Sequence, residues 1–547
     1  MRKRIISVIL VLAIILSVCI IPAYAKSYNI ECDRPVVIIS GDAEAIVDKD
    51  GNQIFKISNF KSLLSRWQDE NGDVDTGKIL DDIKYVFVPY YLEGCILGPF
   101  GNYDKYYDRI YEILSSCFGD VLLDKNGNPQ NGTDISQSRR EQVKNNLSKN
   151  HDTYHVEDYQ FYYDWRLDPV EMADDLNEHI KQVKATTGYD KVSVICRCLG
   201  ANVFFAYVAK YGMADIYGVG MDGVVVNGSE LTGEVICGRF DLDINAINRL
   251  VLDLDATGKV NISDTVKEIL DAVCETGIVE PIWKYVKTMH YNTVVKGLTS
   301  AMALGTFYTF PSYWCSVRAE DYETAKEYVF GSEGSEKRQE WAGLIEKLDN
   351  YDKLVRQHIP EILEEIEENA NLCIISKYGM QLAPIYEDNE LVGDQIISVK
   401  YSSFGATTGT IKEPLSDSYI AKRAAEGKSR YISPDKQIDA STCAYPDKTW
   451  FVKGSSHSDW SLPEMKILCG VICAEEQLTV DTLDGFTRFT VIEYNDNNEP
   501  IIWYPMTEEN CHCENWEIKD YETETGAAAK LKHFGNGLKR IFALINK

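Results

Sequence analysis

One segment limits the fold of this chain more than any other, because it combines a helix, a strand, a tight turn and a second helix. Apolar residues recur at helical spacing from 170 to 184, and Gly188 is typical of a helix end. The apolar run 192–195 then predicts a short buried strand, and the residues from Gly200 onward are again helical. This alternation predicts an α/β fold, in which helices pack on a parallel sheet.

Further apolar runs predict the other strands of this sheet. They lie at residues 35–39, 84–89, 224–226, 372–375 and 449–452. The first of them ends at Ser40-Gly41-Asp42, which indicates a turn directly after the strand. Residues 489–494 and 501–504 flank a polar turn and predict a hairpin.

The remaining segments predict how the chain is divided. Residues 119–150 contain two Asn-Gly pairs and predict a polar surface loop. Residues 235–370 are mainly helical in pattern, so we expect a helical insertion that caps the sheet. We expect the α/β domain with its cap to span residues 26–475. An appendage at 476–547 would hold the hairpin and a terminal helix.

The first 25 residues have the pattern of a secretory signal. Arg2, Lys3 and Arg4 precede a long apolar run, and Ala-Tyr-Ala ends at Ala25, as at a signal-peptidase site. The alternative is an uncleaved membrane anchor, since the run is long for a signal core. We expect cleavage after Ala25 and a secreted, extracellular protein. No later stretch approaches the ~20 apolar residues that cross a bilayer.

Charge and cysteine content limit the expected partners and cofactors. The formal net charge is -28, and loss of the basic signal makes the chain more acidic still, which argues against nucleic acid as a partner. Of the 15 cysteines, 14 remain after loss of the signal and could form disulfides outside the cell, although their irregular spacing predicts no pairing. Cys511-His512-Cys513 has no second cysteine pair at zinc spacing, so we predict neither a metal nor a cofactor.

Cys198 lies in the tight turn between the strand 192–195 and the following helix. Residues 196–200 read Cys-Arg-Cys-Leu-Gly and resemble the Gly-x-Ser-x-Gly nucleophile motif of α/β-hydrolases. Cysteine replaces both the first glycine and the serine of that motif. A thiol paired with histidine is a competent nucleophile for acyl transfer. The alternative is that Cys198 is a buried inert thiol or a disulfide partner.

Other landmarks occur in the order found in the lecithin:cholesterol acyltransferase and lysosomal phospholipase family. The resembling segments are its first core strand and oxyanion loop (residues 35–42), its Asp-Trp-Arg segment (164–166), its Pro-Ser segment in the cap (311–314), its Tyr-Gly step (378–379), and its ending with Cys443, a Trp-containing strand and His457. The resemblance covers roughly residues 33–460. It implies an α/β-hydrolase fold, a mostly parallel sheet flanked by helices, with a helical cap and a C-terminal appendage.

The resemblance also implies roles for individual residues. His457 follows the last predicted core strand on a loop and would be the general base, the alternative being a surface histidine. The backbone N–H groups of Asp42 and Leu199 would form the oxyanion hole, which binds the carbonyl oxygen as it gains charge.

The acid of the family's triad has no direct counterpart at the expected position. The family carries it in a Gly-Asp-Gly-Thr-Val segment, and the corresponding residues 428–432 place Ser429 there. Asp435 and Asp439 lie just beyond. We predict Asp435 as the acid and keep Asp439 as its alternative, although each taken singly also fits a solvated loop charge. A cysteine nucleophile depends less on the acid, because a thiolate–imidazolium pair can form without it.

These observations predict acyltransferase, lipase or phospholipase-like ester chemistry through Cys198 and His457. A lipid or acyl ester substrate, and a membrane surface as a further partner, are implied by the resemblance alone. The alternative is a catalytically inactive protein of the same fold that binds a lipid or a glycan, and the absent serine and displaced acid favour it. A cysteine peptidase has little support, because no peptidase signature surrounds Cys198.

Overall fold

The computed structural model gives the fold of most of the chain. It describes residues 30–41, 44–56, 88–97, 104–147, 154–226, 228–256, 262–291, 305–494 and 500–545, together with 78, 81–82, 85–86, 100–101 and 303. The predicted signal at residues 1–25 lies outside the described residues. No helix in the described part is long and apolar enough to span a membrane.

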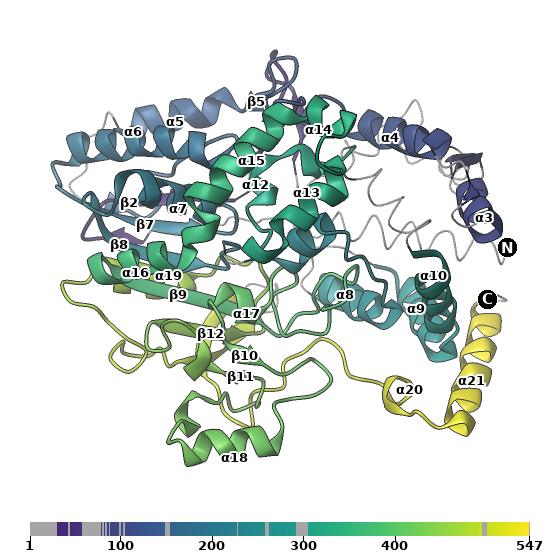
Figure 1. The fold of residues 1–547 in the computed structure, drawn as a ribbon. Coiled ribbons are helices and arrows are strands. Elements are labelled where there is room, and N and C mark those ends of the chain that lie inside the picture. The colour runs from purple at the N-terminus through teal and green to yellow at the C-terminus, as the bar shows by residue number, and fades with distance from the viewer. Residues whose placement is uncertain are drawn as a thin grey trace.

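The fold is built around a seven-stranded, mostly parallel sheet (Figure 1). Its strand order is β14-β13-β12-β9-β8-β7-β2, and only β14 runs antiparallel to its neighbour. The strands are β2 (Val36–Ile39), β7 (Val192–Arg197), β8 (Ile216–Asp222), β9 (Asn371–Tyr378), β12 (Thr449–Lys453), β13 (Phe489–Tyr494) and β14 (Pro500–Pro505). The predicted α/β class is confirmed.

Smaller sheets and many helices surround this sheet. Within the described residues the small sheets pair β1 (Glu31–Cys32) with β6 (Tyr154–His155), β3 (Ile46–Val47) with β4 (Gln53–Phe55) and β5 (Asp134–Ile135), and β10 (Thr407–Thr408) with β11 (Ile438–Asp439). The helices are α3 (Val88–Leu97), α4 (Asp104–Phe118), α5 (Gln137–Leu147), α6 (Pro169–Thr187), α7 (Gly200–Tyr211), α8 (Ile244–Ala256), α9 (Asp264–Thr276), α10 (Val279–His290), α12 (Pro311–Trp314), α13 (Tyr322–Phe330), α14 (Glu336–Glu340), α15 (Ala342–Leu354), α16 (Ile359–Asn369), α17 (Val399–Ser402), α18 (Asp417–Ala425), α19 (Leu462–Ile472), α20 (Asp520–Thr523) and α21 (Ala527–Ile545).

Helices cover both faces of the sheet, so its central strands are buried on both sides. Alternate residues of β2 pack into different cores: Val37 joins the core under α6 and α7, whereas Val36 joins the core under α19. This explains why the strands appear in the sequence as continuous apolar runs rather than alternating ones. The predicted helix at 170–184 is α6, and Gly188 ends it with φ 74° in the left-handed region.

The strand predicted at residues 224–226 was wrong, because strand β8 spans Ile216–Asp222 instead. The strand lies a few residues earlier, in a run that contains Gly218 and Gly220 and therefore looks unlike a strand. A Cβ atom on Gly218 would lie 2.1 Å from the backbone oxygen of Ile472 in α19. The glycine is needed because the helix backbone lies directly against the strand.

Two further expectations from local pattern were wrong. The strand predicted at residues 84–89 is absent among the described residues of that stretch, where α3 instead begins at Val88 with Pro89 in its first turn. The predicted loop at 119–150 contains α5, a mostly exposed helix without an apolar stripe that the sequence could reveal.

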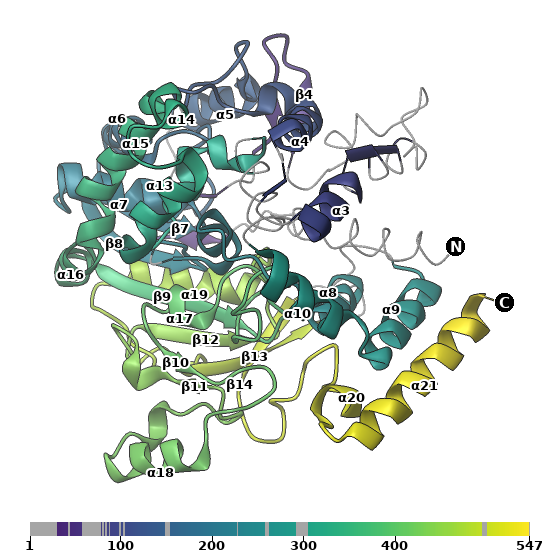
Figure 2. The ribbon, with the colours of Figure 1, turned by 45° about the vertical axis from the view of Figure 1, so that its right-hand side comes forward.

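The second half of the helical segment 235–370 and the C-terminal hairpin both belong to the central α/β layers, whereas α21 packs on α9. Helices α15 and α16 pack on α6, α7 and the sheet, so the second half of the expected cap flanks the sheet, as a crossover between parallel strands must. The predicted hairpin is confirmed as β13 and β14, and it extends the central sheet beside β12. Helix α21 packs along α9, as Figure 2 shows.

Candidate active site

Cys198 lies in a strained turn between the end of β7 and the start of α7. Its φ of 47° is in the left-handed region, which residues other than glycine rarely adopt. Its backbone N–H donates to the carbonyl oxygen of Asp222, at the end of the neighbouring strand β8 (3.3 Å). A turn of this kind presents a side chain at the end of the sheet, as predicted for this residue.

Close packing of two backbone segments explains why glycine occupies position 200, directly after this turn. A Cβ atom on Gly200 would lie 2.2 Å from the backbone oxygen of Ile39, so only glycine fits where α7 begins against the end of β2. Cys196, at the position of the motif's first glycine, is fully buried in the core. The side chain at 196 is accommodated, whereas one at 200 would not be.

His457 is held by two hydrogen bonds to one residue, Asp394. The backbone N–H of His457 donates to the carbonyl oxygen of Asp394 (2.8 Å), and its Nδ1 lies 2.9 Å from Asp394 Oδ2. Both side chains are buried. An ionised carboxylate only accepts hydrogen bonds, so Nδ1 carries the proton and Nε2 is left for another partner.

That partner is Cys198, whose sulfur lies close enough to the His457 ring to raise the pKa of the ring. Burial alone would lower the pKa of His457, but the Asp394 carboxylate and the Cys198 sulfur together raise it to about 10. Gly223 leaves the room that the ring needs, because a Cβ atom there would lie 3.2 Å from both Nδ1 and Cε1 of His457. The structure therefore brings Cys198 and His457 together.

The acid beside the histidine is Asp394 and not Asp435, which corrects the prediction from sequence. Asp435 Oδ2 lies 2.9 Å from Lys453 Nζ and accepts from the hydroxyl of Tyr378 (3.1 Å). Asp439, the alternative, accepts from the side chains of Tyr419 and Arg423. Both carboxylates are thus held in other contacts.

The sequence around Asp394 contains a pattern from which the acid could have been predicted. Residues 393–397 read Gly-Asp-Gln-Ile-Ile, which resembles the Gly-Asp-Gly-Thr-Val segment expected near residue 430. Gln395 takes the place of the second glycine and has φ 90°, a conformation in which glycine is favoured. Asp394 Oδ1 accepts from the backbone N–H groups of Ile396 (3.1 Å) and Ile397 (2.9 Å), which fixes this turn and its carboxylate.

The predicted oxyanion hole is described only in part. Asp42 lies outside the described residues. A Cβ atom on its neighbour Gly41 would lie 3.2 Å from the backbone nitrogen of Leu199 and 3.3 Å from Cys198 Sγ, so this loop packs against the turn. Tyr163 donates to the Ser40 carbonyl oxygen (2.8 Å) and thereby holds the start of the loop.

A buried charge cluster supports the turn from the side of α19. Asp222 pairs with Arg197 (2.7 Å) and Lys377 (2.9 Å), and Lys377 also pairs with Glu464 (2.7 Å). Burial would raise the pKa of Asp222, but Lys377 and Arg197 lower it; burial and Asp222 raise the pKa of Glu464. Removing one partner would leave an uncompensated buried charge, so these groups fix the ends of β7, β8 and β9.

Chemically, a thiol in contact with an imidazole that a carboxylate orients can lose its proton and attack a carbonyl carbon. Among the described residues, no group of three or more His, Cys, Asp or Glu side chains is arranged to hold a metal ion. Comparisons of the chain with protein-family models, curated proteins and solved structures found no match.

Proposed function

We propose that this protein is an acyl-transfer enzyme of the α/β-hydrolase type with a Cys198–His457–Asp394 triad. The observation that carries the proposal is the chain of contacts from the Cys198 thiol through the His457 ring to the Asp394 carboxylate, with Cys198 in a left-handed turn. Nucleophile, acid and base also follow one another along the chain in the order found in α/β-hydrolases.

In the proposed reaction His457 Nε2 holds the proton of Cys198, as the raised pKa of the ring favours, and the Cys198 thiolate attacks the carbonyl carbon of an ester or thioester. The backbone N–H of Leu199 and one from the loop after β2 would bind the oxygen as it gains negative charge. His457 then returns the proton to the leaving group. Water or an acceptor alcohol releases the acyl group from Cys198 in a second, equivalent step.

Asp394 weakens the main argument for an inactive binding protein. That alternative depended on the loss of both the serine and the acid, whereas a carboxylate is in place 2.9 Å from His457 Nδ1. The substrate class still depends on the resemblance to the lecithin:cholesterol acyltransferase family, so we propose a lipid-like acyl ester. Export after cleavage at Ala25 is part of the same proposal.

Acyl hydrolysis by the purified mature chain tests this function. We expect release of p-nitrophenol from p-nitrophenyl esters of increasing acyl length, and release of thiol from matched thioesters, with Cys198→Ala inactive. Cys513→Ser, which changes a thiol away from this site, is the matched control and should behave as wild type. Equal background rates for wild type and Cys198→Ala on every ester and thioester would overturn the proposal and favour a binding function.

A further inference from the structure

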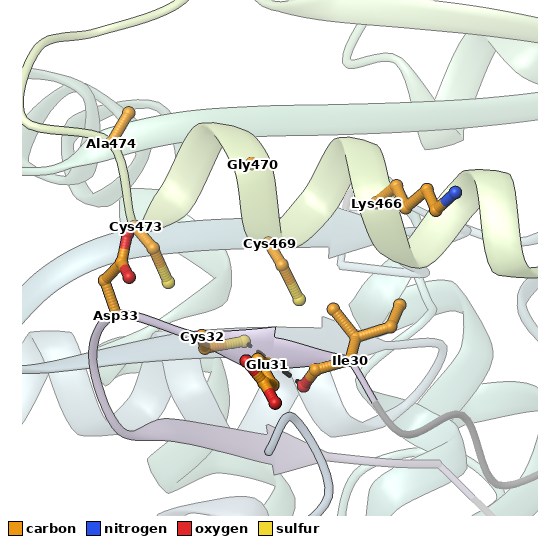
Figure 3. A pocket seen from close by; sticks show the side chains of 9 residues that line it. All are labelled: Ile30, Glu31, Cys32, Asp33, Lys466, Cys469, Gly470, Cys473 and Ala474. Carbon is orange, nitrogen blue, oxygen red and sulfur yellow. Dashed lines mark hydrogen bonds between the residues drawn. The ribbon is translucent and has the colours of Figure 1, made fainter. Parts of the chain in front are cut away.

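Three cysteine side chains share one pocket at the start of the fold (Figure 3). Cys32 ends β1, whereas Cys469 lies in α19 and Cys473 directly follows it. Because residues 469 and 473 are four apart, their side chains lie on the same face of the helix. Figure 3 shows all three sulfur atoms directed into the space between the strand and the helix, a cavity of about 250 Å³.

Cys32 is the shared partner within this group. Its thiol faces those of both Cys469 and Cys473 in this pocket, and both neighbours shift the pKa of Cys32. Its Sγ also lies 3.9 Å from the carbonyl oxygen of Ile30. All three sulfurs are thiols in this structure. The contact with Cys469 and burial raise the pKa of Cys32, so the reduced group is uncharged near neutral pH.

Geometry decides which two sulfurs can be joined. A disulfide requires Cβ atoms about 3.5–4.5 Å apart. Side chains four residues apart on a helix have Cβ atoms about 5–6 Å apart, so a bond between Cys469 and Cys473 is disfavoured. Cys32 faces both from the strand, so it is the sulfur that can be joined to either of them.

We propose that Cys32 is an oxidation site that joins β1 to α19 through a disulfide with Cys469 or Cys473. A small-molecule disulfide is the oxidant. The Cys32 thiol, which is uncharged at rest, loses its proton as its sulfur attacks one sulfur of this disulfide, and one small thiolate is released. A thiolate of α19 then attacks the Cys32 sulfur of this mixed disulfide and releases the second. The two protons from the protein thiols end on the two released thiols, so the protein pair is oxidised and the small disulfide is reduced.

The bond would hold the part of the fold that leads to Cys198. Only three residues separate Cys32 from β2, the edge strand that pairs with β7. Strand β2 in turn leads to Gly41, which packs against Cys198. Because the bond closes a very long loop, we expect the oxidised protein to melt roughly 3 °C higher than the reduced one. This inference depends on the contacts of the three thiols and not on the proposed activity.

Peptide mapping without reductant tests the proposal directly. The full chain is incubated with oxidised glutathione, its remaining thiols are alkylated, and it is digested with trypsin. Residues 27–49 carry Cys32 as their only cysteine, and residues 467–488 carry Cys469 and Cys473. We expect these two peptides to be recovered cross-linked, and fragmentation of the pair identifies the α19 partner.

Variants separate this bond from other oxidation. Cys32→Ser and the double variant Cys469→Ser/Cys473→Ser should lose the cross-link and the rise in melting temperature, whereas Cys513→Ser should keep both. Recovery of Cys32 as a free thiol, or only as its glutathione adduct, in oxidised wild type would overturn the proposal. A cross-link from residues 27–49 to any other peptide would do the same. The wild-type map alone decides the matter if a variant fails to fold.

Discussion

The variant Asp394→Asn tests the position of the acid. It keeps the size of the side chain, and its amide oxygen can still accept from the N–H groups of Ile396 and Ile397. The amide nitrogen would then face His457 Nδ1, where the carboxylate oxygen lies at 2.9 Å. Two donors cannot share that contact, so the ring must present Nδ1 as an acceptor. Nε2 would then carry a proton towards Cys198, which is the wrong tautomer for a base.

The expected loss of activity in Asp394→Asn can be worked out from the interactions that stabilise the protonated His457 ring. The pKa of His457 lies at about 10 instead of 6.5. This difference corresponds to about 5 kcal/mol in favour of the protonated ring. Asp394 and Cys198 supply this stabilisation against the opposing effect of burial, and Asp394 is the larger contributor, so we assign at least half of it, roughly 2–3 kcal/mol, to Asp394. We therefore expect kcat/KM for a p-nitrophenyl ester at pH 7 to fall about 100-fold.

Asp435→Asn is the matched control, because it changes the carboxylate that the sequence favoured. It removes a contact to Lys453 and should lower the melting temperature, while kcat/KM of the folded fraction stays within about threefold of wild type. Circular dichroism at the assay temperature confirms that each variant is folded. Wild-type kcat/KM in Asp394→Asn, or the 100-fold loss in folded Asp435→Asn, would show that Asp394 is not the acid.

Three further predictions concern the other groups of the site. With the acid present, Cys198→Ser should hydrolyse activated esters and react with fluorophosphonate probes; an unlabelled, folded serine variant would contradict an intact triad. Gly223→Ala places a methyl group 3.2 Å from the His457 ring, at a residue whose φ is 53°. We expect kcat to fall at least about 10-fold, while the protein is destabilised by only about 1 kcal/mol. Unchanged kcat would contradict the position of the ring. Because the folded pKa of His457 is raised, its charged form contributes stability that is complete below about pH 6.5 and is lost as pH rises towards 10. The difference in melting temperature between wild type and His457→Ala should therefore narrow over that range, and a constant difference would contradict the assignment.

Strands and helices with a strong apolar pattern could be predicted from the sequence. The runs at 35–39 and 192–195 became core strands because both faces of the sheet are covered, which makes a buried strand continuously apolar. Strand β8 could not be placed, because its glycines serve the close approach of α19, a contact distant in sequence. Helix α5 was missed because it lies largely exposed and carries no apolar periodicity.

The site was predicted to the extent that each residue is tied to a local pattern. Cys198 follows a strand and precedes a helix, and His457 follows the next-to-last parallel strand, so both could be found from their neighbours. Asp394 lies in an irregular loop after β9, more than 60 residues before the histidine that it contacts. Its place depends on how that loop folds over the end of the sheet. In the sequence, its position is indicated only by Gly393 before it and the apolar residues after Gln395.

Acylation of Cys198 by an ester or thioester substrate is the step on which the proposed function depends. Wild-type protein is mixed with excess p-nitrophenyl ester, quenched in acid within the first turnover, digested with trypsin and analysed by mass spectrometry. Trypsin releases Cys198 at the start of the peptide 198–210, which contains no other cysteine. We expect about one p-nitrophenolate per chain in the initial burst, and an acyl group on this peptide that is absent from Cys198→Ala. An unmodified peptide while the ester is consumed, or an acyl group on another cysteine, would contradict the proposed function.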